Sequence, residues 1–292
     1  MAASGQSHEN PLLLKDIDIY TSNVGGHDYG KMTGIMIEGD DTSIAHIRLE
    51  NIAIVGNNHS YTGSTFEYGL HVRLGVDLSD LVITGSSFSK LSYGMFVGQV
   101  KSDDPGSLDE VEICDTVFES NSNKGMYVEK LSNATLTDVS FINNGTLDLI
   151  EDDWARPYLA GLDINLKYGT YENIALNNLT VVYNGLKAKD GVGVAIKARD
   201  DGSYNTNAAT LRNVVINGGV FRSNERGLRF GEPGKDNLGP TKVTIRNVAF
   251  MGETPQYEGV DGSRYGALVN ETLATIDAAG NYWGHESGPY HS

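Results

Sequence analysis

The chain has 292 residues, including 35 glycines and 7 prolines, and a formal net charge of −16. This acidic balance argues against binding to DNA, RNA or anionic membranes, because the field of the whole molecule repels polyanions. No apolar run approaches the roughly 20 residues that span a bilayer, so we expect no membrane insertion. The single cysteine, Cys114, excludes an internal disulfide.

Residues 1–11, MAASGQSHENP, precede the patterned part of the chain and are expected to form an N-terminal extension. This stretch has neither the basic region nor the apolar segment of a signal peptide. We predict one repetitive domain over the remaining residues, 12–292.

Along that domain, a glycine followed by an apolar, a variable and an apolar residue recurs at intervals of 25 to 39 residues. The motif starts at Gly34, Gly69, Gly94, Gly125, Gly161, Gly193, Gly227 and Gly266. Unequal intervals indicate a constant strand joined by loops of variable length. Alternation within a strand predicts that the two apolar residues of each motif face a core and that the variable residue faces outward.

A second strand with period-two alternation precedes most of these glycines, as in ATLTDVSF and ATLRNVVI. An asparagine follows its last aromatic or branched residue by three positions. The pairs are Phe118 with Asn121, Phe141 with Asn144, Val181 with Asn184, and Phe221 with Asn224. If the repeats stack in register, the phenylalanines form an internal stack and the asparagines form a hydrogen-bonded column.

Short strands, no helical periodicity and glycine or asparagine at the corners are typical of a chain that buries its core only by stacking repeats. The expected fold is all-β: a single-domain right-handed parallel β-helix, or solenoid, of roughly eight or nine coils. Near the end, GNYWGHESGP is expected to close the stack with a plug around residues 280–290 that uses Tyr282 and Trp283.

That terminal segment and the repeated strands resemble right-handed parallel β-helix proteins of the pectate-lyase-like superfamily. The resemblance covers the chain from about residue 12. It implies a secreted or cell-surface location and allows a polysaccharide to lie along a strand face. The superfamily also contains noncatalytic proteins, so the resemblance does not choose an activity. Two of its catalytic patterns are missing: the DPH triplet of mannuronan C5-epimerases and the NTD, DD, GHG and RIK set of polygalacturonases, of which only Asp200-Asp201 matches a member.

The outward positions of the repeated strand form two predicted columns. The first reads Met36, His71, Phe96, Tyr127, Asp163, Ala195, Arg229 and Leu268. The second reads Glu38, Arg73, Gly98, Glu129, Asn165, Lys197, Gly231 and Asn270, with Arg199 one step beyond Lys197. Adjacent strands lie about 4.8 Å apart, so charged groups and exposed aromatic rings are expected to gather at the middle of this face.

Three functions fit that face. A lyase or C5-epimerase of a uronate polymer would use Lys197 as the base and Tyr127 or His71 as the acid. The sugar carboxylate would then bind Arg229, Arg199 or Arg73. A glycoside hydrolase would use Glu129 and Asp163 as its paired carboxylates. A noncatalytic module for glycan binding, adhesion or structure would need no chemistry at all.

Further substrate contacts are expected from Phe96 and Asn165, and from Trp154 in the long segment LDLIEDDWARPYLAG. Asp-Asp pairs recur at residues 40–41, 103–104, 152–153 and 200–201. Stacked acidic turns can supply the oxygen ligands of Ca²⁺, and Asp200 with Asp201 is the pair predicted to bind it. No organic cofactor is expected. The leading hypothesis is an extracellular β-helix that binds an acidic polysaccharide and cleaves or epimerises it.

Overall fold

The structure is a computed structural model that describes most of the chain. The described residues are 7–20, 32–39, 43–57, 67–98, 106–145, 158–186, 188, 190–235, 237–252, 266–286 and 288. Within them the protein is all-β, apart from short turns such as the 3₁₀ helix η2 (Gly202–Asn207). No described helix is long and apolar enough to cross a membrane.

The strands form two sheets, and every pairing between named strands in the described ranges is parallel. The smaller sheet consists, in spatial order, of β2 (Met32–Ile37), β4 (Glu67–Val72), β7 (Tyr93–Val97), β10 (Lys124–Val128), β13 (Ala160–Leu166), β15 (Val192–Ala198), β17 (Leu228–Phe230) and β20 (Leu268–Asn270).

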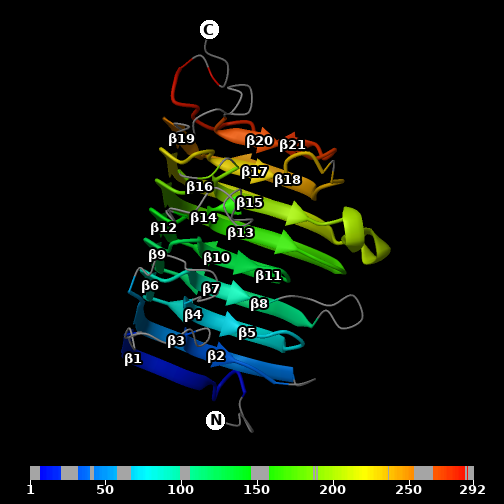
Figure 1. The fold of residues 1–292 in the computed structure, drawn as a ribbon. Helices are drawn as coiled ribbons and strands as arrows, with labels where there is room; N and C mark the ends of the chain where they lie inside the picture. Colours follow the sequence, from blue (N-terminus) through cyan, green and yellow to red (C-terminus); the bar gives the residue numbers. More distant parts are fainter. Residues whose placement is uncertain are drawn as a thin grey trace.

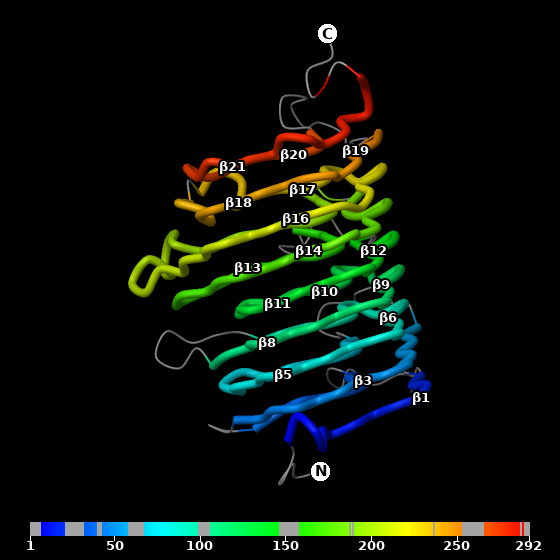
Figure 2. The backbone as a smooth tube through the Cα atoms, turned by 180° about the vertical axis from the view of Figure 1, so that it is seen from behind, coloured from blue at the N-terminus to red at the C-terminus, as the bar shows by residue number. Residues whose placement is uncertain are grey.

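The larger sheet collects the strands that lie between these in sequence. They are β1 (Leu12–Tyr20), β3 (Ser43–Val55), β5 (Asp77–Thr84), β6 (Ser87–Ser89), β8 (Ser107–Cys114), β9 (Val117–Glu119), β11 (Ser132–Thr137), β12 (Ser140–Ile142), β14 (Thr170–Val182), β16 (Thr210–Arg222), β18 (Thr241–Arg246), β19 (Ala249–Met251) and β21 (Ile276–Asp277). The chain thus alternates between the sheets, and its strands stack in sequence order from one end to the other (Figure 1; Figure 2 from behind).

The repeated glycine is required by the close approach of neighbouring strands in the smaller sheet. A Cβ atom on Gly94 would lie 2.5 Å from the carbonyl oxygen of Gly125, and one on Gly125 would lie 2.7 Å from that of Gly161. Real Cβ atoms do not approach backbone oxygens so closely, so any larger residue would push the strands apart. The motif found in the sequence therefore marks a packing constraint.

The interior contains the two predicted columns. The rings of Phe88, Phe118 and Phe141 stack with centroids 5.1 and 5.2 Å apart. The asparagine column is confirmed: the side-chain amide of Asn121 donates to Asn144 at 2.8 Å, that of Asn144 to Asn184 at 3.0 Å, and that of Asn184 to Asn224 at 2.9 Å. Each of these asparagines is fully buried, so their hydrogen bonds satisfy amides that water cannot reach.

Two expectations about the C-terminal part need correction. The first outward column ends at Val269, because Arg229 pairs with Val269 and Leu228 pairs with Leu268. The last motif is therefore shifted by one residue from the predicted alignment. Of the two aromatic residues expected to plug the end, Trp283 stacks on Phe250 at 4.9 Å, whereas the side chain of Tyr282 is about half exposed.

Candidate functional site

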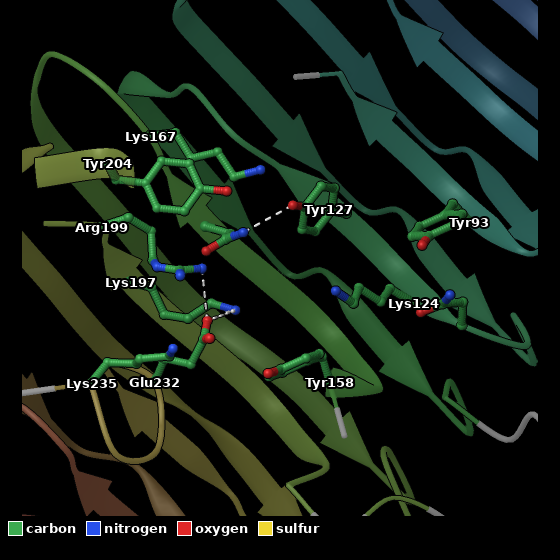
Figure 3. Close-up of a pocket in the computed structure, with 12 residues that line it drawn as sticks. Tyr93, Lys124, Tyr127, Tyr158, Lys167, Lys197, Arg199, Tyr204, Glu232 and Lys235 are labelled. Atoms are coloured by element: carbon green, nitrogen blue, oxygen red, sulfur yellow. Dashed lines mark hydrogen bonds and ion pairs between the residues drawn. The ribbon is translucent and has the colours of Figure 1, made fainter. Parts of the chain in front are cut away.

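The outer face of the smaller sheet has a cavity of about 340 Å³ over β10, β13 and β15, which we call the charged pocket (Figure 3). Cationic side chains dominate its lining: Lys124, Lys167, Lys197, Arg199 and Lys235. Tyrosine rings form much of the rest: Tyr93, Tyr127, Tyr158 and Tyr204. The remaining lining residues are Asn123, Asn165 and Glu232.

Strand register brings the central groups together. Tyr127 in β10 pairs with Asp163 in β13, and Asn165 in β13 pairs with Lys197 in β15. These residues alternate with core residues such as Leu162 and Ile164, so their side chains all leave the outer face of the sheet. The predicted register of these strands is therefore confirmed.

Asp163 is the centre of a buried ionic network. Its carboxylate lies 2.7 Å from Nζ of Lys124 and 2.9 Å from Nζ of Lys197. Only 1% of Asp163 and 2% of Lys197 is exposed. Burial alone would raise the pKa of Asp163, but the two ammonium groups outweigh it and hold that pKa well below its usual range. Asp163 therefore stays charged at neutral pH.

Lys197 has an unusual protonation equilibrium. Burial lowers the pKa of its ammonium to about 8, with Lys124 and Arg229 acting in the same direction and Asp163 opposing them. A lysine with this pKa supplies some neutral amine at physiological pH, which an ordinary surface lysine does not. Lys197 also lies 3.7 Å from Glu232, and its ammonium is 5.8 Å from the ring centre of Tyr158.

A second hydrogen-bonded group adjoins the first. The hydroxyl of Tyr127 donates to Oε1 of Glu129 at 2.6 Å and accepts from the amide of Asn165 at 2.9 Å, and Lys167 is paired with the same oxygen of Glu129. Burial raises the pKa of the Tyr127 hydroxyl well above its ordinary value, so Tyr127 keeps its proton at neutral pH. Lys124 lies over the Tyr127 ring, 4.3 Å from its centre.

Arg199 forms the third side of the charged pocket. Its guanidinium binds both oxygens of Asp201, at 2.6 and 2.8 Å, and Oε2 of Glu232 at 2.9 Å. It also lies over the ring of Tyr204 at 4.6 Å. Lys197 and Arg199 therefore face the same pocket, as their alternate positions predicted.

The carboxylates of the predicted calcium pair already have protein partners. Asp201 is bound by Arg199, and Asp200 accepts hydrogen bonds from the side chain of Asn237 at 2.6 Å and from the backbone of Leu238 at 2.9 Å. Calcium binding at Asp200 and Asp201 stays a prediction to which these contacts add no support. The other three Asp-Asp pairs lie outside the described residues, as does Trp154.

Three predicted site residues lie apart from the charged pocket. Arg73 is half exposed and pairs with Glu38 at 2.7 Å. His71 packs in an aromatic group with its ring 4.7 Å from Tyr68 and 5.4 Å from Phe96. Phe96 itself stacks on Tyr127 at 5.3 Å, so it supports the edge of the pocket from the neighbouring strand.

The remaining predicted residue, Arg229, is buried behind the pocket with 1% of its surface exposed, and it donates to the backbone oxygen of Asp190 at 2.7 Å. The expectation of exposed charges and rings on an open face is wrong for this part of the sheet, because Tyr127, Asp163, Lys197 and Arg229 are all buried. Substrate binding by Arg229 stays a prediction.

Sequence reasoning missed Lys124, which immediately precedes a motif glycine. Strict alternation would point the side chain of Lys124 inward. The inward position belongs instead to Gly125, because a Cβ atom on Gly125 would lie 3.0 Å from the core residues Phe118 and Phe141. Lys124 therefore faces outward with the equivalent Tyr93, its partner in β7. Comparison of the residues that directly precede the motif glycines would have identified both Lys124 and Tyr93. Tyr204 comes from the 3₁₀ helix η2, and Glu232 and Lys235 come from a loop, so strand periodicity gives no signal for them.

The charged pocket combines features that suit an acidic, hydroxylated ligand. Its lining has five cationic groups and one carboxylate, in a protein with a net charge of −16. Among the described residues, Oδ1 of Asn165 and Oε2 of Glu129 are buried without a hydrogen-bond partner, so both could accept from a ligand hydroxyl. Tyrosine rings offer flat apolar faces beside these polar groups.

Comparison of the chain with protein-family models, with curated proteins and with solved structures gives no match.

Proposed function

We propose that the protein is a right-handed parallel β-helix of about eight or nine coils, of the pectate-lyase-like kind, that acts on a uronate-containing polysaccharide. The two parallel sheets and the constant glycine column support the fold part of this proposal. The five cations that line the charged pocket carry the functional part, because they can exchange their carboxylate partners Asp163, Glu129, Asp201 and Glu232 for those of a polymer. The rest of the molecule is strongly acidic and would repel the same polymer.

The proposed reaction is β-elimination or C5 epimerisation. The substrate carboxylate binds beside Lys124 and Arg199, which lowers the cost of removing the adjacent C5 proton. The neutral amine of Lys197 takes that proton. In elimination the released electron pair forms the C4–C5 double bond, the C4–O4 bond breaks, and Tyr127 donates its proton to the leaving oxygen. In epimerisation Tyr127 donates its proton to C5 from the opposite face, and the chain remains intact.

The chemistry needs an amine that is neutral near physiological pH and a hydroxyl that keeps its proton. The lowered pKa of Lys197, about 8, leaves a minority of the amine neutral at physiological pH and a larger share at mildly alkaline pH, and the raised pKa of Tyr127 keeps its proton in place. Glycoside hydrolysis has less support, because a general acid needs a raised carboxyl pKa and Asp163 has a strongly lowered one. Its partner Glu129 is bound by both Tyr127 and Lys167.

One observation favours a noncatalytic alternative. Lys124, Lys167, Lys197 and Arg199 each have a carboxylate partner within the protein. A pocket whose charges compensate one another can bind an acidic glycan by exchanging partners, with no bond broken in the sugar. The second candidate is therefore a glycan-binding module that uses the same pocket.

A substrate screen separates these functions. Purified protein is incubated with a panel of uronate polymers, and the ultraviolet absorbance of unsaturated uronate is followed together with binding and the NMR signals of C5 epimers. We expect new absorbance or epimers with the wild type, their loss in Lys197→Met and Tyr127→Phe, and their retention in the control variant Arg73→Ala. Binding without turnover would support the noncatalytic module. The proposal is overturned if the wild type neither binds nor converts any of the polymers.

A further inference from the structure

Strands β3 and β5 are adjacent near the N-terminal end of the stack (Figure 2). A second cluster of side chains lies there on the outer face of the larger sheet. It comprises His8, His46 and Asp80, and we call it the histidine cluster. Oδ2 of Asp80 lies 2.6 Å from Nδ1 of His46 and 3.1 Å from Nδ1 of His8. One ligand atom from each residue lies within 4.8 Å of the other two.

The backbone places two of these residues side by side. His46 and Asp80 occupy matching positions on β3 and β5, between the pairs Ala45–Ser79 and Ile47–Leu81. Both have left-handed backbone angles, with φ of 59° and 51°. Such positions favour Asn, Asp and His among non-glycine residues, and side chains at matching positions of adjacent strands lie about 4.8 Å apart.

Other residue types occupy the same position in strands farther along the sheet. In β11, β14 and β16 it is held by Asn133, Asn173 and Asn213, whose amides form hydrogen bonds of 2.7 and 2.8 Å from strand to strand. Asparagine thus suffices for the fold at this position. At the N-terminal end of the sheet, histidine and aspartate occupy this position instead, and their nitrogen and oxygen atoms can coordinate a metal ion.

His8 reaches the cluster from a separate segment. Two backbone hydrogen bonds between Ser7 and Asn10, of 3.2 and 3.0 Å, close a turn around it. The side chain of His8 is 80% exposed, so it has no role in the core. Its ring nitrogen nevertheless points at the same carboxylate oxygen as His46.

Arg48 fixes the carboxylate of Asp80. Its Nη2 lies 2.7 Å from Oδ1, and its Nη1 donates to the backbone oxygen of Asp80 at 2.8 Å, which leaves Oδ2 for the two imidazoles. Nη2 also lies 3.3 Å from Nδ1 of His8. Nδ1 of His8 thus lies between an acceptor, Oδ2 of Asp80, and a donor, Nη2 of Arg48.

The surrounding charges suit a divalent cation. The guanidinium of Arg48 offsets the charge of Asp80, but Glu110 and Glu112 line the same cavity, which has a volume of about 680 Å³. Glu110 holds the next matching position after Asp80, between Asp109 and Val111. Two glutamates would balance two positive charges brought by a metal ion.

We propose that His8, His46 and Asp80 form a zinc site that ties the N-terminal turn to β3 and β5. Two imidazole nitrogens and one carboxylate oxygen are a donor set that Zn²⁺ accepts readily, whereas Ca²⁺ takes oxygen ligands. The site is separate from the charged pocket, which lies on the other sheet. It would hold Zn²⁺ whether or not the polysaccharide proposal is correct.

The test is a calorimetric titration of the full chain with Zn²⁺ after treatment with a chelator. We expect one Zn²⁺ per chain in the wild type, and about tenfold or greater weakening in His8→Ala, which removes a ligand atom, and in Asp80→Asn, which replaces the charged carboxylate with a neutral amide. His8 is exposed, so its variant folds normally. A matched histidine variant away from the cluster, His285→Ala, should bind as the wild type does.

Ca²⁺ is the second probe, and it should not compete with Zn²⁺ at the same concentration. The proposal is overturned if the wild type binds no stoichiometric Zn²⁺, if His8→Ala binds it as tightly as the wild type, or if Ca²⁺ displaces it.

Discussion

The buried asparagine column lies in the turns that follow strands of the larger sheet, and the charged pocket lies on the outer face of the smaller sheet. The two regions use polar side chains in opposite ways. In the column, one residue type repeats in successive turns, and each amide bonds to the next. In the pocket, successive strands present different residues: Tyr127 is followed by Asp163 and then by Ala195. Repeated residues satisfy the buried hydrogen-bonding groups of the fold, whereas non-repeated residues give the pocket its own chemistry.

The two regions also differ in how they are stabilised. Every asparagine in the column is neutral, so stacking needs only hydrogen bonds between identical groups. The pocket keeps full charges away from water, where the cost of desolvation must be met by close ion pairs such as those of Asp163. The pocket is therefore the region in which a single substitution leaves the largest uncompensated charge.

The largest expected effect follows from Asp163→Asn. This change leaves Lys124 and Lys197 buried without their shared counter-charge, and it should lower the free energy of unfolding by about 3–5 kcal/mol. Urea denaturation measures the loss. The double variant with Lys197→Met should recover part of it, and failure to recover any would contradict the ionic account of the pocket.

Asn184→Ala tests the column. It removes the acceptor used by the backbone and side-chain amides of Asn144 and should cost about 2–4 kcal/mol. The half-buried Asn173 of the outer asparagine column serves as the comparison. Asn173→Ala should cost only about 1 kcal/mol, because water can replace its hydrogen bonds and the main penalty is alanine in a left-handed backbone with φ of 59°. Equal losses in the two variants, measured by the same unfolding titration, would show that burial does not distinguish these columns.

The pH dependence of stability isolates Lys197. Its folded pKa of about 8 lies below the unfolded value, so between pH 8 and about 10.5 the unfolded chain holds a proton that the folded chain has released. Stability attributable to Lys197 should therefore rise across that range, by up to about 3 kcal/mol. The difference between wild type and Lys197→Met in unfolding experiments at several pH values reports this contribution. A difference that stays flat would contradict the lowered pKa.

Arg73→Ala should have the smallest effect. The Arg73–Glu38 pair is half exposed on both sides and lies outside the charged pocket, so its loss should change stability by less than about 0.5 kcal/mol. Affinity for uronate oligosaccharides should not change either. A marked loss of affinity in this variant would extend the binding face to the N-terminal strands.

The sequence was sufficient to predict the features that recur in each repeat. The asparagine column of Asn121, Asn144, Asn184 and Asn224 follows from spacing alone, because each repeat imposes the same local geometry. The pairing of Tyr127 with Asp163 and of Asn165 with Lys197 follows from the same glycine-started motif. These predictions needed only alternation and a fixed register.

Other features depended on contacts that periodicity does not encode. Lys124 was missed because the chain bends at Gly125 and breaks strict alternation. The burial of Lys197 depends on residues from separate segments, such as Glu232 and Tyr158, whose positions follow from the folded loops. His46 and Asp80 lie 34 residues apart in sequence and meet only through the pairing of β3 with β5.

The most direct test of the central claim is the binding of a uronate oligosaccharide and of its methyl ester, measured by calorimetry on the wild type and on Lys235→Ala and Arg199→Gln. The account predicts that the acid binds, that the neutral ester binds much more weakly, and that both variants lose affinity for the acid. Equal affinity for acid and ester, or an unchanged affinity in both variants, would contradict the assignment of the charged pocket as a carboxylate-binding site.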